Sequence, residues 1–282
     1  MSSDIEQDAI GFSLNPRESS STNAIDEGPF STRYNMKHSK RGLAIIFNHK
    51  HFKMHNLKTR QGTDKDKEDL EALFKNLKFD VKCYDDLDRL EVEKVLVSVS
   101  AHDHSEEDCL VVAVLSHGDN KKIFARDTYY PPDMLWKYFN GNESPSLIGK
   151  PKLFFIQACR GEKIVTPVRV LQRQALTEVD SIQEDKSASY SIPVIADILV
   201  MYSTLEDHLS WRNPINGSYF IQSLIRQLST HADKKDLLSI LTYVNREVAV
   251  GYSEEMREQN IIGYAHKQMS SIVSMLTREV YF

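Results

Sequence analysis

The sequence has 282 residues, of which 41 % are hydrophobic, so it can bury a large core. Its formal net charge of −5 gives no reason to expect nucleic acid or an anionic membrane as a partner. Three cysteines are too few for a disulfide framework, and no apolar stretch approaches the roughly 20 residues of a membrane span. The first residues are polar and acidic, unlike a signal peptide. Together these features indicate a soluble intracellular protein, and we expect a cytoplasmic location.

Residues 1 to about 35 are rich in Ser, Asn, Asp and Glu and show no apolar periodicity, which predicts a disordered N-terminal arm. Such an arm is too short to hold a folded recruitment domain.

Beyond the arm, short apolar runs alternate with segments whose apolar residues recur at helical spacing. Strands are predicted at 43–47, 79–83, 109–115, 153–156 and 198–202, with one or two more in 271–282. Helices are predicted at 64–77 with Thr63 or Asp64 as N-cap, at 90–99, from Pro131 and Pro132 through 139, and at 220–228 and 237–244. Because several strands are apolar on both faces, we expect an α/β fold with a mostly parallel central sheet sandwiched by helices.

Residues 162–191 interrupt this alternation with about thirty mainly polar residues. A segment of that length without secondary structure is uncommon inside a compact domain and is usually functional or disordered. We therefore expect a linker here between two halves of one domain.

Two chemically suggestive side chains each follow a predicted strand, and they would share one edge of the sheet if these strands are neighbours. His117 and Gly118 come after the strand at 109–115, and Cys159 comes after the strand at 153–156. Because parallel strands place their carboxyl ends at one edge of a sheet, the thiol and the imidazole can meet there as nucleophile and base. The amides of Gly118 and Cys159 are candidate donors to an oxyanion. Cys83 and Cys109 lie within apolar strands and are predicted to be small buried hydrophobes.

The residues around Cys159, Gln157–Gly161 (QACRG), match the nucleophile signature of the caspase family. Further segments resemble executioner caspases in the same order along the chain, and together they cover about residues 40–282. These segments are Thr59–Asp64, Ser116–Gly118, Lys150–Gly161, Tyr202–Thr204, Ser210–Asn213, Gly217–Ser218 and Ser274–Thr277.

This resemblance implies that His117 and Cys159 are the catalytic dyad of a cysteine endopeptidase. It also implies that Arg60, Gln157 and Arg212 form the primary specificity pocket, where two guanidinium groups and an amide suit the carboxylate of a substrate aspartate. The other substrate-binding residues implied are Leu209, Ser210, Trp211, Asn213 and Tyr219. Leu209 and Tyr219 stand where many executioner caspases have an aromatic residue and a tryptophan, so the preference at the fourth substrate position stays open.

The resemblance further implies a zymogen. Asp180 followed by Ser181, in the linker 162–191, is the expected cleavage site, with Asp185 as a weaker alternative. Asp26 is a separate and weaker candidate, for release of the N-terminal arm. Cutting after Asp180 would separate a large subunit, 36–180, from a small subunit, 181–282, both parts of one domain.

The expected partners are proteins with aspartate at the cut site and a second copy of the chain, paired through residues 271–282. By resemblance, upstream initiator caspases and inhibitor-of-apoptosis proteins also act on this protein, and no cofactor is expected.

Two groups of histidines invite a metal-site interpretation. They are His49, His51 and His55, and His102 with His104. No cysteine or carboxylate pattern completes either group, so we expect exposed histidines and no metal site.

Three alternatives to an active executioner remain. A catalytically silent caspase-like regulator, which binds other caspases, should have lost a catalytic or pocket residue. A related peptidase that cuts after Arg or Lys would need acidic pocket residues, where this chain has Arg60 and Arg212. An initiator caspase would need a long N-terminal adaptor domain.

Overall fold

The computed structural model describes residues 28, 31–165, 193, 195–252 and 267–282. A six-stranded sheet forms its centre, in the order β11-β8-β7-β3-β1-β2. Its strands are β1 (Leu43–Asn48), β2 (Asp80–Asp85), β3 (Leu110–Leu115), β7 (Lys152–Gln157), β8 (Ile198–Tyr202) and β11 (Ser271–Ser274). All neighbouring strands pair in parallel except β11, which runs antiparallel to β8. The expected α/β fold with a mostly parallel sheet is confirmed.

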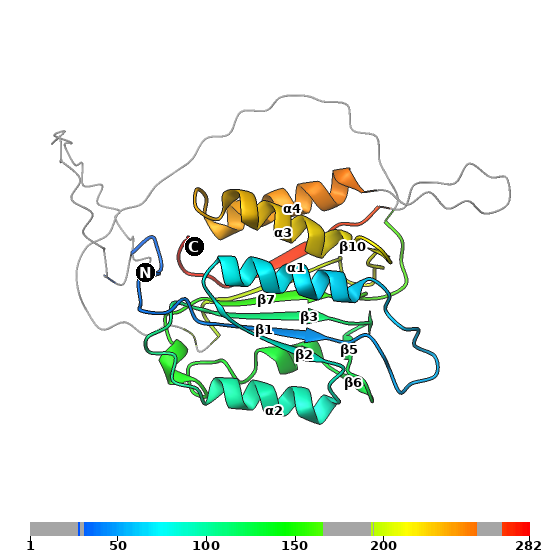
Figure 1. Ribbon diagram of the computed structural model, residues 1–282. Helices are drawn as coiled ribbons and strands as arrows, with labels where there is room; N and C mark the ends of the chain where they lie inside the picture. Colours follow the sequence, from blue (N-terminus) through cyan, green and yellow to red (C-terminus); the bar gives the residue numbers. More distant parts are fainter. Residues whose placement is uncertain (1–27, 29–30, 166–192, 194, 253–266) are drawn as a thin grey trace, which may run out of the picture.

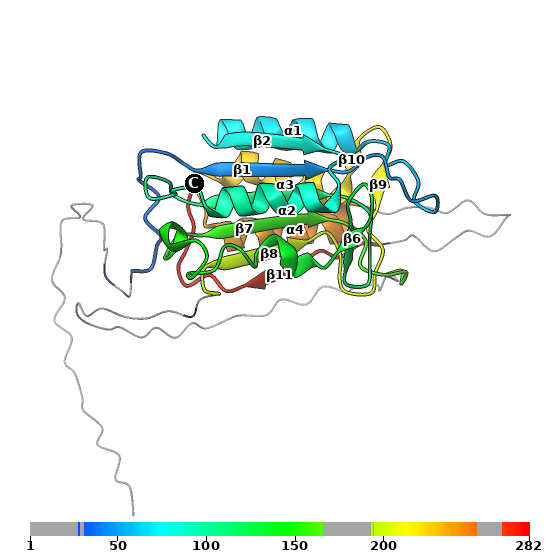
Figure 2. The same cartoon turned by 90° about the horizontal axis from the view of Figure 1, so that it is seen from below.

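Helices cover both faces of this sheet, as Figures 1 and 2 show. One face carries α1 (Thr63–Asn76), α3 (Tyr219–His231) and α4 (Leu237–Gly251), and the other carries α2 (Arg89–Ser100). None of the helices within the described ranges is long and apolar enough to cross a membrane.

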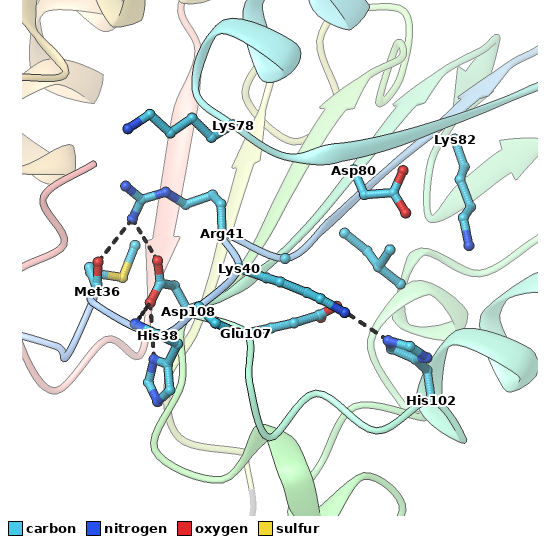
Figure 3. Close-up of a pocket in the computed structure, with 13 residues that line it drawn as sticks. Met36, His38, Lys40, Arg41, Lys78, Asp80, Lys82, His102, Glu107 and Asp108 are labelled. Atoms are coloured by element: carbon cyan, nitrogen blue, oxygen red, sulfur yellow. Dashed lines mark hydrogen bonds and ion pairs between the residues drawn. The ribbon is translucent and has the colours of Figure 1, made fainter.

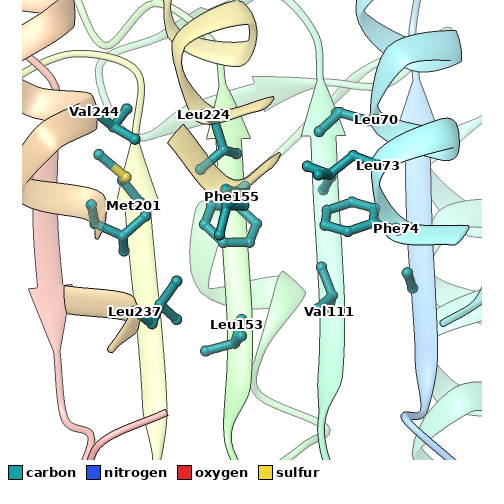
Figure 4. Packing of buried hydrophobic residues seen from close by; sticks show 14 of the residues in the cluster. Leu70, Leu73, Phe74, Val111, Leu153, Phe155, Met201, Leu224, Leu237 and Val244 are labelled. Atoms are coloured by element: carbon teal, nitrogen blue, oxygen red, sulfur yellow. The ribbon is translucent and has the colours of Figure 1, made fainter. Parts of the chain in front are cut away.

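Alternate residues of each central strand supply the two halves of the core. In β3, Val111 joins the cluster under α1, α3 and α4, whereas Val112 joins the cluster on the α2 side. Phe155 of β7 packs toward Leu224 of α3 in the first cluster (Figure 4). Burying a side chain of this size contributes about 1.5–3 kcal/mol to the free energy of folding. The two clusters therefore stabilise the packing of the helices on the sheet.

The start of α1 differs from the expectation. Its N-cap is Gly62, with a left-handed φ of 81°, rather than Thr63 or Asp64. The Thr63 hydroxyl cannot cap the helix because it donates to Asn48 Oδ1 at 2.6 Å and accepts from Arg60 Nη1 at 2.7 Å. The helix expected through residue 139 is also shorter, a 3₁₀ helix over Pro132–Leu135 followed by turns.

Two small sheets escaped the sequence prediction. One is formed by β4 (Gly118–Asp119), β5 (Lys122–Phe124) and β6 (Tyr129–Tyr130), directly after β3. The other pairs β9 (Arg212–Asn213) with β10 (Gly217–Ser218). Strands of two or three residues are too short to show a periodicity, and both sheets flank the carboxyl edge of the central sheet.

Packing begins earlier than residue 36. Tyr34 is buried, and its hydroxyl donates to Asp197 Oδ1 at 2.7 Å, while Thr277 Oγ1 donates to the same oxygen. The predicted arm therefore ends before the boundary near residue 35, and its first 27 residues lie outside the described part. Within residues 271–282 only β11 is a strand, and beyond it Glu279 forms an isolated bridge with Arg33.

Candidate active site

The loops that follow β3 and β7 meet at the carboxyl edge of the sheet. Leu115 pairs with Gln157 at the end of the two strands, so His117 and Cys159 each come two residues beyond a paired position. The backbones approach so closely that a Cβ atom on Gly118 would lie 2.2 Å from the Cys159 carbonyl oxygen. Only glycine fits there, and the expected juxtaposition of these loops is confirmed.

A backbone carbonyl fixes the orientation of His117. Its Nε2 lies 2.7 Å from the carbonyl oxygen of Lys58, which can only accept, so Nε2 carries the proton and Nδ1 is left as the basic nitrogen. Burial is the main influence on the pKa of His117 and lowers it, with the nearby Arg60 and Arg212 acting in the same direction. The imidazole is therefore neutral at pH 7 and able to accept a proton.

The thiol of Cys159 lies against the second half of the chain. Ser210 N–H donates to Sγ at 3.4 Å, and the Ser210 carbonyl oxygen lies 3.7 Å from the same sulfur. Cys159 is half-buried, whereas Cys109 is fully buried. Burial raises the pKa of Cys109, and raises that of Cys83 to about 11. These two thiols stay protonated at neutral pH, which makes them poor nucleophiles.

Arg60 is fully buried beside these loops. Its Nη1 donates to the His49 carbonyl at 2.9 Å and to Thr63 Oγ1 at 2.7 Å. Its Nε and Nη2 are buried and have no hydrogen-bond partner among the described residues. Burial, reinforced by the charge of Arg212, lowers the pKa of Arg60 to about 9, so the guanidinium is still charged at pH 7. A buried cation with two unused donors calls for an anionic ligand.

Arg212 and Gln157 complete this polar group. Arg212 Nε donates to the Gln61 carbonyl at 2.7 Å, and its charge is felt by both Arg60 and His117. Gln157 Nε2 donates to Ser210 Oγ at 2.9 Å, while its Oε1 is buried without a partner in the described ranges. The site thus places two cations beside a thiol and a neutral imidazole.

Comparison with known proteins identifies this arrangement. The family model described as "Caspase domain" matches residues 41–281. The chain belongs to the caspase family. Caspase-1 of Spodoptera frugiperda is 40 % identical over 275 residues, covering 96 % of this chain and 89 % of the relative. Caspase drICE of Drosophila melanogaster is 42 % identical over 258 residues, covering 89 % and 73 %, and Caspase-3 of Mesocricetus auratus is 41 % identical over 261 residues, covering 92 % and 90 %.

The caspase fold is supported by a solved structure as well. The crystal structure of Caspase-1 from Spodoptera frugiperda superposes with a TM-score of 0.80 at 39 % identity, covering 94 % of this chain and 98 % of that chain. Family membership makes this protein a cysteine peptidase by homology, and the sequence-based assignment to the caspases is confirmed.

The remaining residues that the caspase resemblance assigned to substrate lie around the same edge. Trp211 N–H donates to Gln268 Oε1 at 2.7 Å, and Asn213 Oδ1 accepts from two amides of its own turn. The Leu209 amide donates to the Lys163 carbonyl at 2.9 Å, and the Tyr219 ring stacks on Tyr252 at 4.2 Å. Their roles as substrate contacts stay predictions, and Asp180 and Ser181 lie outside the described residues.

Sequence reasoning missed Asp66, a buried acid on α1 close to the site of this caspase. Both carboxylate oxygens of Asp66 accept from Ser218 N–H, at 2.9 and 3.0 Å, and Gln222 Nε2 donates to Oδ1 at 3.1 Å. A Cβ atom on Gly217 would lie 2.2 Å from Asp66 Oδ1, so the glycine is required. Asp66 thereby ties α1, next to Arg60, to the start of α3. The charged residues Lys65 and Lys67 on either side of Asp66 make this part of the sequence resemble a solvent-exposed helix face.

The expectation that the clustered histidines are exposed is wrong for two of them. His49 and His104 are fully buried. Burial, with Arg60 nearby, lowers the pKa of His49 to about 4, so it adds no charge beneath the pocket at pH 7. The expectation that no carboxylate completes the second group is also wrong, because Glu107 lies against both His102 and His104.

Proposed function

We propose that this caspase is an executioner protease that cuts other proteins after aspartate. The observation that carries the proposal is the buried, charged Arg60, whose Nε and Nη2 have no partner among the described residues, close to Arg212 and to the Cys159 thiol. An aspartate side chain on the substrate would accept from these donors and offset one of the two positive charges. An asparagine in its place would leave charge uncompensated, and discrimination of that kind reaches about 10⁴-fold.

The proposed chemistry gives His117 and Cys159 one role each. His117 Nδ1 takes the proton of the Cys159 thiol, and the thiolate attacks the backbone carbonyl carbon of the substrate aspartate. The amides of Gly118 and Cys159 are the proposed donors to the resulting oxyanion. His117 then gives its proton to the leaving amine, and water hydrolyses the thioester to release the acid and regenerate the thiol.

A peptide library tests this function directly. After incubation with the purified, activated protein, sequencing of the new ends should show aspartate before nearly every cut. A library cut mainly after Lys or Arg would contradict the pocket assignment.

A catalytically silent regulator that binds other caspases is the second candidate function. The same peptide-library experiment distinguishes it from an active protease. Cys159, His117, Arg60 and Arg212 are all present, which argues for an active enzyme. A folded, processed protein that cuts no peptide at all would favour the regulator.

We propose that the chain is a zymogen activated by cleavage after Asp180. The linker 162–191 joins the half that carries Cys159 to the half that carries Ser210 and Arg212, so freeing it can let the loops of the site rearrange. Mass spectrometry of the active protein should show a new N-terminus at Ser181, and Asp180→Ala should stay a single chain of low activity. Full activity in the uncut variant would rule out this activation step.

We also propose a two-fold homodimer formed through β11. This strand is the outermost of the sheet beside β8, and the side chain of Val273 is half-exposed. An exposed strand edge is a template for pairing with a second copy. Sedimentation at micromolar concentration should give a dimer, and Val273→Lys should shift it toward monomer. An active enzyme that sediments as a monomer would contradict the assignment.

A further inference from the structure

A cluster of metal-ligating side chains lies at the end of the molecule opposite the active site. His102 and His104 follow α2, and Glu107 precedes β3, so one short loop supplies all three. Their ligand atoms lie within 4.8 Å of one another, the single such group of three in the described part of the chain. Nothing in the catalytic site uses these residues, which lie at the amino ends of the strands.

The hydrogen bonds of His104 prepare one of its nitrogens for a ligand. Nε2 lies 2.8 Å from the carbonyl oxygen of Val99, which can only accept, so Nε2 carries the proton. Nδ1 is then the nitrogen that faces Glu107 Oε2, at 2.6 Å, a hydrogen-bond distance, so a proton lies between these two atoms and a bound ion would displace it. A ring nitrogen that donates to a backbone carbonyl while the other faces the ligand is the usual arrangement of a metal-bound histidine.

The other two side chains are placed to complete the set. His102 Nε2 lies 3.2 Å from the second oxygen of Glu107, Oε1. The Glu107 side chain is 5 % exposed and that of His104 is 0 % exposed, whereas His102 is 45 % exposed and can turn toward an ion. Bonds of about 2.0–2.2 Å to zinc separate ligand atoms by about 3.3 Å, so the required movements are below about 1 Å for the buried pair.

The loop backbone is held in place before any ion arrives. Lys150 Nζ donates to the carbonyls of His104, Ser105 and Glu107 at 2.6–2.7 Å, and Ser146 Oγ accepts from the His104 amide. Burial lowers the pKa of Lys150, while the nearby carboxylates, Asp108 and Glu107 more than Glu106 and Asp103, act in the opposite direction. His102 and Glu107 also line a pocket of about 560 Å³, which gives an ion a path from solvent (Figure 3).

We propose that His102, His104 and Glu107 form a binding site for a divalent transition-metal ion, with Zn²⁺ as the best match. Two imidazoles and one carboxylate are a recurring zinc ligand set that leaves a fourth position for water. A bound ion would link the end of α2 to the start of β3, the strand that leads to His117 at the opposite edge.

The test separates this site from the active-site thiol. The full chain carrying Cys159→Ala is titrated with ZnCl₂ by calorimetry, and should bind one ion. Adding His102→Ala, which alters an exposed side chain and should not disturb folding, should weaken binding by at least about 100-fold, since even outer-shell changes weaken metal sites by about 10–100-fold. Adding His55→Ala instead, as an exposed-histidine control, should leave the affinity unchanged.

Co²⁺ gives an independent readout of the ligands. In the Cys159→Ala protein it should show visible d–d bands without a thiolate charge-transfer band, and these bands should vanish with His102→Ala. Absence of binding in Cys159→Ala, equal affinity in the His102→Ala protein, or a thiolate band would each overturn the proposal.

Discussion

Cys159→Ala should abolish peptide hydrolysis, lowering kcat by at least about 10⁴-fold, because no other thiol in the described part of the chain is placed to replace it. Cys109 is fully buried and Cys83 lies in a strand, and burial holds both thiols in the protonated form. His117→Ala should lose nearly as much, since His117 is the base proposed for the thiol. The measurement is steady-state hydrolysis of an aspartyl peptide by protein that has been activated beforehand with an added protease.

The matched controls are Cys83→Ala and Cys109→Ala, which remove a thiol elsewhere and should change kcat little. Combining Cys159→Ala with His117→Ala should add almost nothing to either single change, because the two groups act as one unit. Substantial hydrolysis by the Cys159→Ala protein would make the assigned mechanism wrong.

The second large effect concerns the pocket. Arg60→Ala or Arg212→Ala should lower kcat/KM for aspartyl peptides by at least about 100-fold. Each charge-assisted hydrogen bond contributes about 1.5–3 kcal/mol, and a factor of ten corresponds to about 1.4 kcal/mol, so the loss of one forked contact accounts for this figure. Arg60→Ala also frees Thr63 Oγ1 and the His49 carbonyl, so Arg212, which is only partly buried, is the safer position.

Arg246→Ala serves as the control, because Arg246 is exposed on α4, where its guanidinium lies over the Tyr243 ring. Its kcat/KM should equal that of the parent protein. Thermal denaturation of every variant distinguishes loss of the pocket from loss of the fold. A folded Arg212→Ala protein that cuts aspartyl peptides at the parent rate would remove Arg212 from the pocket.

The sequence predicted the central sheet and the position of its catalytic loops because both depend on local patterns. Runs such as Leu110–Leu115 are apolar at every position, which is typical of a parallel strand buried on both faces. The motif residues directly after such runs had to reach the carboxyl edge. Their family resemblance added the two arginines proposed for the pocket, Arg60 and Arg212, which lie more than 150 residues apart and share no local pattern.

What the sequence did not reveal depends on contacts between distant backbones. The Lys58 carbonyl that orients His117 has no side-chain signature at all. Asp66 has the pattern of a solvated helix face, and only the arrival of Ser218 from the other half of the chain shows why it is buried. The prediction of the α1 N-cap was wrong for a related reason, because the Thr63 hydroxyl already forms hydrogen bonds with Arg60 and Asn48.

The pairing of β7 with β8 spans the linker, and so does the bond from Tyr34 to Asp197. While the chain is intact, these contacts close a loop within one molecule. The entropic cost of closing that loop grows only slowly with its length. If the chain is cut after Asp180 as proposed, the same contacts join two molecules, and refolding becomes a second-order reaction. The denaturation midpoint of the mature enzyme then rises with protein concentration, whereas that of the precursor does not while it stays monomeric. Dilution would therefore inactivate the mature enzyme by mass action, without any further proteolysis.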